Sequence, residues 1–414
     1  MAVVTNLLDA HAVSDPYAVF AELRDAGPVM WSPEHRAWIL TSYAEVHHGF
    51  RDLRLSSDRL TPLERRLSPE HRRALGPTFD LLRGWMVFHD APAHDRLREP
   101  VRRTFTPKAV EALRPKIAAL VDELVSALET RLRDGETVDL VDAVAFPLPA
   151  IVIAELLGVP ASDREQFKSW SSELGAIVFG ASNRNDQVER ATAGTEHFAE
   201  YFGALIERYR REPADNLVSA LVAVADGGTA DAGSGLTPGE LVGALTLLLF
   251  GGHETTANLI GNATFALLQQ PDALAWMHDH PEAIVGSAEE LHRYDGPTKV
   301  MVRVVDEPHD RHGFAFEPGQ TVFLSVAGAN RDPAVFDEPD RLMPDRPNGQ
   351  AHLGFGYGVH YCVGAPLARL EAQVAMGALV ARLPDLQLGV PVDDLVWGSS
   401  ILGRGLRHLP VAMV

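Results

Sequence analysis

The sequence predicts a mainly α-helical fold with a smaller β region, and three observations support this prediction. Helical apolar patterns dominate from about residue 100 to 295. Runs of β-branched residues bounded by turn residues occur near the N-terminus and around 300–330. The 414 residues are 46% apolar and can bury a large core. At roughly 150 residues per domain, this length suggests two or three domains, although a single large domain is also possible.

In chain order, the first predicted elements are a hairpin and a long helix. Apolar residues at 29–31 and 38–40 flank a polar break, which suits two short strands. Residues 117–128 carry apolar side chains at helical spacing and predict a surface helix. Residues 226–235, with the sequence DGGTADAGSG, have the composition and length of a loop, so no domain boundary is placed there.

Another helix is predicted to begin at Thr237. Thr237 can cap it, Pro238 suits the first helical position, and Glu240 completes a capping box. The sequence is then apolar on nearly all sides through Leu249, which indicates a helix in the middle of the molecule.

Strand signals return near residue 300. The β-branched runs at 300–305 and 321–326 are separated by Pro318 and Gly319. They predict two strands joined by a turn.

Charge and cysteine content exclude several classes of function. The net charge of −19 argues against nucleic acid as a partner, because such binding needs clustered Lys and Arg. The single cysteine, Cys362, excludes an internal disulfide, a cysteine-rich zinc site and a four-thiolate iron–sulfur cluster. The first residues lack a secretory pattern, and the apolar stretch 241–250 is shorter than the roughly 18 residues of a bilayer span. We expect a cytoplasmic protein with no membrane span.

Cys362 lies in a glycine-rich segment directly before a predicted helix. Glycines at 354, 356, 358 and 364 permit tight turns and close approach to a flat, bulky group. The helix predicted from Ala365 offers unpaired N–H groups and a partial positive charge, which favour thiolate over thiol. This setting indicates a metal-ligating sulfur, although a lone intracellular cysteine is more often a small buried hydrophobe.

The string F-G-x-G-x-H-x-C-x-G at residues 355–364 resembles the haem-binding loop of the cytochrome P450 family at every defining position. The resemblance extends from about residue 15 to the C-terminus. It implies the P450 fold, with a long central helix over haem b and the Cys362 thiolate as proximal iron ligand. Phe355 and Gly364 are expected to bind the cofactor. The resemblance implies a single catalytic domain over residues 1–414. We expect no fused reductase, so the resemblance implies a separate ferredoxin and ferredoxin reductase.

The predicted central helix carries the motif Gly251-Gly252-His253-Glu254-Thr255. A helical glycine costs about 1 kcal/mol relative to alanine, so the pair suggests that something approaches the backbone or that the helix opens locally. The resemblance assigns proton delivery toward dioxygen to Glu254 and Thr255, and no catalytic role to His253. The alternative is a packing glycine pair followed by a threonine bonded back to its own helix.

Two further sets of residues match the family pattern. Glu290 and Arg293 lie three apart on a predicted helix and can pair; alone this means only a solvated ion pair, but the resemblance implies a buried structural pair. Haem propionates need cationic or donor partners. The candidates implied by the resemblance are His94, Arg98, Arg303 and His360.

The resemblance also implies a mostly apolar substrate pocket, which favours a lipophilic small molecule. Its candidate lining residues are Val87, Phe88, Leu247, Phe250, Gly251, Thr298, Lys299, Val300, Ile401 and Leu402. Lys299 is an unexpected charge in this set. It either binds a substrate carboxylate or turns toward a propionate or solvent, and we favour the second interpretation.

Together these patterns predict a haem-thiolate monooxygenase that uses O2 to hydroxylate or otherwise oxidise its substrate. A peroxide-driven or redox-neutral haem-thiolate enzyme is one alternative, and the Glu254–Thr255 pair disfavours it. A non-enzymatic haem sensor or electron carrier is another, and it would need no such pair. An acidic ferredoxin would require a local basic patch on this acidic chain, for which Arg102, Arg103 and Lys108 are candidates.

Overall fold

A computed structural model describes residues 6–7, 12–13, 15–178, 186–227, 235–398, 400 and 402–413. The chain forms two compact units, and each is assembled from segments that are separated in the sequence. Unit 1 is built from Met1–Leu55, Val110–Pro149 and Glu254–Val414, and unit 2 from Ser56–Ala109 and Ala150–His253. Helices dominate the described residues and strands form a smaller part, so the predicted fold class is confirmed.

The main β region is a five-stranded sheet with the order β1-β2-β8-β5-β3. The predicted N-terminal hairpin is confirmed, because β1 and β2 pair antiparallel with Val29 opposite Leu40. β8 pairs parallel with β2 and antiparallel with β5. The strand bounds are β1 Val29–Ser32, β2 Ala37–Leu40, β3 Leu55–Ser56, β5 Val300–Val305 and β8 Thr321–Ser325.

The connection from β5 to β8 is more elaborate than the predicted turn. The two strands exist as expected, but β6 (His309–Arg311) and β7 (Phe314–Phe316) form an additional antiparallel pair between them. These strands are too short to show an alternating pattern, which is why the sequence suggested a simple turn. One face of the main sheet is covered by a core that includes Trp38, Phe50 and Phe316.

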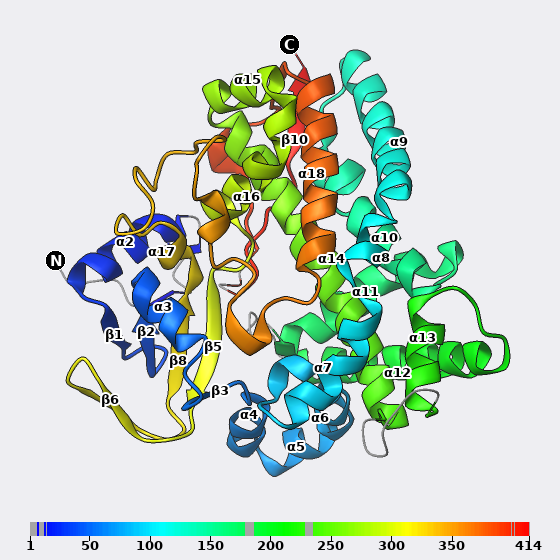
Figure 1. Cartoon of the computed structure of the whole chain (residues 1–414), viewed down its shortest axis with the longest axis vertical. Coiled ribbons are helices and arrows are strands. Elements are labelled where there is room, and N and C mark those ends of the chain that lie inside the picture. Colours follow the sequence, from blue (N-terminus) through cyan, green and yellow to red (C-terminus); the bar gives the residue numbers. More distant parts are fainter. Residues whose placement is uncertain are drawn as a thin grey trace. The chain divides into compact units, whose positions relative to one another are not determined.

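The helices of unit 1 include α9 (Arg114–Arg133) and α18 (Ala365–Arg382), which lie side by side (Figure 1). The predicted helix at 117–128 is confirmed within α9, and its apolar stripe is buried. α16 (Ile284–Asp295) packs against α18. The remaining elements include α2 Pro16–Ala26, α3 Tyr43–Gly49, α15 Pro271–Asp279, α17 Val326–Asn330, and a three-stranded sheet of β4 Val138–Asp139, β10 Pro410–Met413 and β9 Leu386–Leu388.

Unit 2 is mainly helical over its described residues. Aromatic side chains hold α11 (Arg164–Val178) against α12 (Gln187–Arg211), with Phe167 packed on Phe198 and Phe202. The other helices are α4 Leu60–Arg66, α5 Pro69–Ala74, α6 Gly76–Leu82, α7 Ala93–Thr104 and α13 Leu217–Ala225. Three helices cross the boundaries between the units: α8 Pro107–Glu111, α10 Pro147–Leu157 and α14 Pro238–Leu268.

The predicted central helix is α14, which runs for 31 residues. Its capping box is confirmed, because the Thr237 N–H donates to Glu240 Oε2 at 2.9 Å and the Glu240 N–H donates to Thr237 Oγ1 at 3.3 Å. Arg96 on α7 forms an ion pair with Glu240, so the start of α14 is also fixed to a second helix of unit 2. Within the described residues, no helix combines the length and apolarity needed to cross a membrane.

Candidate functional site

Cys362 lies in the loop that precedes α18, and we call residues 352–364 the cysteine loop. Positive φ angles of 71° at Gly356 and 73° at Gly358 turn this loop, and residues with a Cβ adopt such angles only under strain. The Cys362 N–H donates to the carbonyl of Phe355 at 3.0 Å. α18 begins at Ala365, as predicted, with a proline in its first turn. The side chain of Cys362 is exposed.

The donor set at this loop fits haem iron. A free cysteine is usually buried, whereas Cys362 is exposed at the start of an 18-residue helix, where N–H groups and the helix dipole favour thiolate. Gly364 is the N-cap of that helix, and a Cβ placed on it would lie 3.8 Å from the sulfur. A single accessible cysteine sulfur on a glycine-turned loop matches the proximal ligation of a haem-thiolate site.

The glycine pair on α14 has two different environments, both in unit 2. A Cβ on Gly252 would lie 2.9 Å from Cγ1 of Ile153, so this glycine is needed for close packing against α10. A Cβ on Gly251 would meet nothing within 4 Å, and Gly251 is exposed on a helix that is otherwise largely buried. The helix stays regular at this point, so the glycines do not open it. Gly251 therefore leaves room for a bound group beside the backbone.

The acid and alcohol that follow the glycines, Glu254 and Thr255, are both partly exposed. Burial raises the pKa of Glu254 from 4.5 to about 7, because the charged form loses hydration. A carboxyl group with this pKa can both hold and release a proton near neutral pH. His253 is buried instead, and its Nδ1 bonds the carbonyl of Leu249 at 2.7 Å.

The four propionate candidates are divided between the units. In unit 1, Arg303 on β5 is buried with Nη1 donating to the carbonyl of Val302 at 3.0 Å, and His360 is partly exposed in the cysteine loop. In unit 2, His94 is buried on α7, and Arg98 follows one turn later and is partly exposed. Each group is a charged or hydrogen-bonding residue suited to a carboxylate.

Glu290 and Arg293 form a fully buried ion pair in unit 1, with nitrogen–oxygen distances of 2.6 and 2.8 Å. The sequence did not reveal a third member, Arg346, whose Nε donates to both oxygens of Glu290 at 3.1 and 3.0 Å. The Arg293 guanidinium also donates to the carbonyl of Asn330. This cluster fixes the segment before the cysteine loop, and no local pattern could have identified Arg346, which lies 56 residues from Glu290.

The structure contradicts both sequence interpretations of Lys299. Its Nζ is buried, pairs with Asp295 Oδ1, and donates to the carbonyl of Gly296 at 2.7 Å and to the hydroxyl of Tyr17. Burial alone would raise the pKa of Asp295, but Lys299 and Arg404 lower it to about 2. Lys299 therefore pairs with an internal carboxylate, and its three N–H groups are directed to these three acceptors, so none is left for substrate, a propionate or solvent.

The other pocket candidates differ in exposure. Val87 is 37% exposed, and Leu247, Thr298 and Leu402 are partly exposed. Phe88 and Phe250 are buried against Trp85, with ring centroids 5.8 and 5.2 Å away, so they pack in the interior of unit 2. Val300 is also fully buried, and Ile401 lies outside the described residues.

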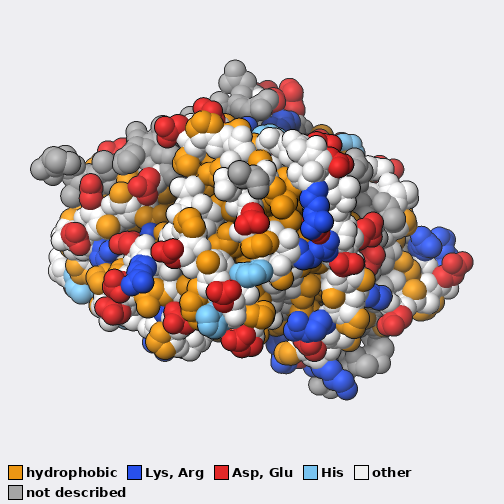
Figure 2. Space-filling view, turned by 90° about the horizontal axis from the view of Figure 1, so that it is seen from above, with side chains coloured by type: hydrophobic (Ala, Val, Ile, Leu, Met, Phe, Trp, Pro, Cys, Tyr) orange, Lys and Arg blue, Asp and Glu red, His pale blue; other side chains and the backbone are white. Residues whose placement is uncertain are grey.

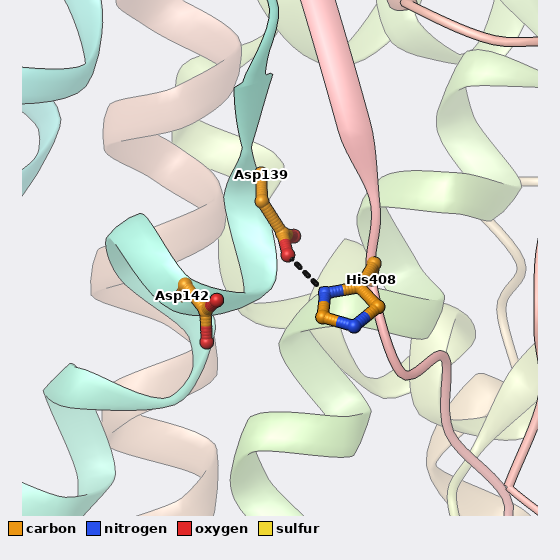
Figure 3. Close-up of side chains that lie close together, drawn as sticks. All are labelled: Asp139, Asp142 and His408. Carbon is orange, nitrogen blue, oxygen red and sulfur yellow. Dashed lines mark hydrogen bonds and ion pairs between the residues drawn. The ribbon is translucent and has the colours of Figure 1, made fainter.

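A second group of potential metal ligands, Asp139, Asp142 and His408, lies in unit 1 (Figure 3). Asp139 Oδ2 bonds His408 Nδ1 at 2.6 Å, while its Oδ1 accepts from the N–H groups of Val141 and Leu409. Both oxygens of Asp139 are therefore used to join β4 and β10. We therefore interpret the cluster as a structural link between these two strands.

Comparison with known proteins gives a consistent result. The family model described as "Cytochrome P450" matches residues 72–384. A vitamin D(3) 25-hydroxylase from Pseudonocardia autotrophica is 41% identical over 402 residues, covering 96% of this chain and 94% of its own. A 6-deoxyerythronolide B hydroxylase from Saccharopolyspora erythraea is 38% identical, with 96% of each chain covered. The tirandamycin C-bound P450 monooxygenase TamI superposes with a TM-score of 0.84 at 39% identity, over 98% of this chain and 99% of its own.

Proposed function

Because this chain belongs to the cytochrome P450 family, we propose that it oxidises a lipophilic small molecule with O2 at a haem held by Cys362. The family binds haem b through a cysteine thiolate, and the chain is a monooxygenase of the bacterial type. When bound and reduced, haem supplies the activation of dioxygen. The observation that carries the assignment of Cys362 is its exposed sulfur at the start of α18.

The protein's part in the reaction is to position the groups and deliver protons. Glu254 would hold a proton near neutral pH because burial raises its pKa to about 7, and Thr255 would pass it on through its hydroxyl. Exposed Gly251 would leave space for the reacting oxygen or substrate beside α14. Arg303 and His360, together with His94 and Arg98, would anchor the propionates.

We propose a polyketide or secosteroid as the substrate class. The pocket candidates that remain exposed are mostly apolar, which favours such molecules over acids. Two relatives are named as hydroxylases of vitamin D(3) and of 6-deoxyerythronolide B, and a third is bound to tirandamycin C. With Lys299 neutralised inside the protein, we expect no cation there for a substrate carboxylate.

We also propose that units 1 and 2 are parts of one catalytic domain.

We propose a separate ferredoxin and its reductase as the electron source. Arg102 and Arg103, two candidates for ferredoxin docking, both pair with Glu99 at 2.8 and 2.7 Å, so their positive charge is partly neutralised. On the face shown in Figure 2, basic groups likewise have acidic groups beside them. Arg103→Glu should slow reduction by ferredoxin without changing substrate affinity, and the opposite pattern would contradict this docking site.

The test of the assignment is the absorption spectrum of the reduced protein with carbon monoxide. Thiolate ligation gives a strongly red-shifted Soret band, which the parent should show and Cys362→His should lose while retaining fold. Product formation with O2 and an electron donor, compared with product formation from hydrogen peroxide alone, separates the monooxygenase from a peroxide-driven enzyme. A parent protein that binds no haem would refute the proposal.

A further inference from the structure

The cysteine loop is connected to α16 by four polar side chains in unit 1. We call Glu289, His352, Tyr361 and Arg369 the Glu289 network. Glu289 belongs to α16, Arg369 belongs to α18, and the other two lie at the two ends of the cysteine loop. Glu289 is only 8% exposed, so the charges at its centre are largely removed from water.

Arg369 makes three directed contacts in this network. Its Nε and Nη2 donate to the two oxygens of Glu289 at 2.7 and 2.9 Å, and its Nη1 donates to the Tyr361 hydroxyl at 2.7 Å. Burial alone would raise the pKa of Glu289, but its bonds to His352 and Arg369 lower it to about 2. The bidentate pair is therefore charged at neutral pH and fixes the plane of the guanidinium.

His352 connects Glu289 to the other end of the loop. The Gly354 N–H donates to His352 Nδ1 at 3.0 Å, so this nitrogen must carry a lone pair. The hydrogen then lies on Nε2, which donates to Glu289 Oε2 at 3.2 Å. A Cβ on Gly354 would lie 2.5 Å from Nε2 of His292, so the loop backbone has little freedom here.

Phe355 connects the Glu289 network to Cys362. The Arg369 guanidinium carbon lies 4.5 Å from the Phe355 ring centroid, and the His292 ring meets the same ring edge-on at 4.3 Å. The carbonyl of Phe355 accepts the N–H of Cys362, and Tyr361 is the neighbour of Cys362. The guanidinium thus contacts two residues that precede Cys362: one accepts the Cys362 N–H, and the other is adjacent to it in the chain.

We propose that Glu289 and Arg369 are positioning residues that hold the Cys362 sulfur in the orientation needed for haem ligation. The inference rests on the proposed role of Cys362. Without Glu289, the guanidinium would lose its orienting partner, and its contacts with Phe355 and Tyr361 would no longer fix the loop. The ligand would then detach or become protonated more readily, although the fold is retained.

The experiment measures thiolate ligation directly in haem-loaded protein. Glu289→Gln, Arg369→Lys and Tyr361→Phe are compared by the fraction of the reduced carbon monoxide complex with the red-shifted Soret band, and by the rate at which that band is lost at fixed temperature. The matched control is Arg382→Gln. Arg382 is also on α18 and is 29% exposed like Arg369, but it pairs with Glu129 and Asp122 of α9.

Glu289→Gln should lose the band about tenfold faster than the parent, since loss of a charge-assisted hydrogen bond shifts an equilibrium by this order. Arg369→Lys and Tyr361→Phe should change in the same direction, and Arg382→Gln should keep the parental rate even where its unfolding midpoint falls. Parental rates in Tyr361→Phe and Arg369→Lys would overturn the inference, whether or not Glu289→Gln folds. Absence of the band from the parent itself would instead overturn the assignment of Cys362.

Discussion

Replacing Glu254 with glutamine should make stability less sensitive to pH. Burial raises the pKa of the Glu254 carboxyl from 4.5 to about 7. As pH rises above 4.5, the carboxyl ionises in the unfolded chain before it ionises in the folded protein. The native state therefore loses stability between pH 4.5 and about 7, and the full cost is present above pH 7.

The size of this effect follows from the same two pKa values. The difference between 4.5 and about 7 corresponds to about 3 kcal/mol at roughly 1.4 kcal/mol per pKa unit. Glu254→Gln keeps the shape of the side chain and removes the charge. The variant should be more stable than the parent at pH 8 by up to about 3 kcal/mol, and close to the parent at pH 4.5.

Urea unfolding of the haem-loaded protein, followed by circular dichroism at pH 5 and pH 8, measures this difference. Glu371→Gln is the comparison, because burial also holds the pKa of Glu371 well above its usual range, and neither of its oxygens has a hydrogen-bond partner among the described residues. Both variants should gain stability at pH 8, but Glu254→Gln should also slow O2-dependent product formation by about 100-fold. An equal stability difference at both pH values would refute the electrostatic reasoning.

Three further predictions concern packing and buried charge. Gly243→Ala brings a Cβ to 2.6 Å from the backbone of Gly84 and should lower the free energy of unfolding by about 1–3 kcal/mol. Gly203→Ala places its Cβ in open space and should raise the free energy of unfolding by up to about 1 kcal/mol. Equal melting temperatures of the two variants would contradict this prediction. Arg346→Met removes one of the two cations that pair with buried Glu290, and it should lower the free energy of unfolding in urea by about 3 kcal/mol. A change near zero would contradict the role of Arg346 in this buried cluster. Lys299→Met should leave the affinity for acidic ligands unchanged in spectral titrations, and a selective loss would revive the substrate-carboxylate hypothesis.

The parts of the fold that the sequence predicts correctly depend on neighbours in the chain. The capping box at Thr237 and the helix from Ala365 each use residues within a few positions, and the hairpin at 29–43 requires only two short patterns and a break. Physical rules for helix ends and strand alternation act over this range, so these elements could be predicted without tertiary information.

The missed residues have partners that are distant in the sequence. Arg369 pairs with Glu289 across 80 positions, and Arg346 pairs with Glu290 across 56. In isolation each arginine is an ordinary surface charge, and only the packing of α16 beside the loop and α18 makes it the partner of a buried carboxylate. Lys299 was misjudged for a related reason, since the positions of Tyr17 and Arg404 around Asp295 depend on both ends of the chain.

One helix organises all three of these clusters. Glu289, Glu290 and Asp295 project from α16 and are each at least nine-tenths buried. Each acid pairs with cations from a different segment. Glu289 pairs with Arg369 after the cysteine loop, and Glu290 pairs with Arg346 before it. Asp295 pairs with Lys299 and Arg404. Buried ion pairs contribute little net stability, because desolvation offsets their attraction, but an unpaired partner is strongly destabilising. An arrangement that misplaces one of these segments leaves a buried carboxylate unpaired and is therefore unfavourable. The acids of α16 therefore select one placement for the chain on both sides of Cys362, which is what a ligand on an irregular loop requires.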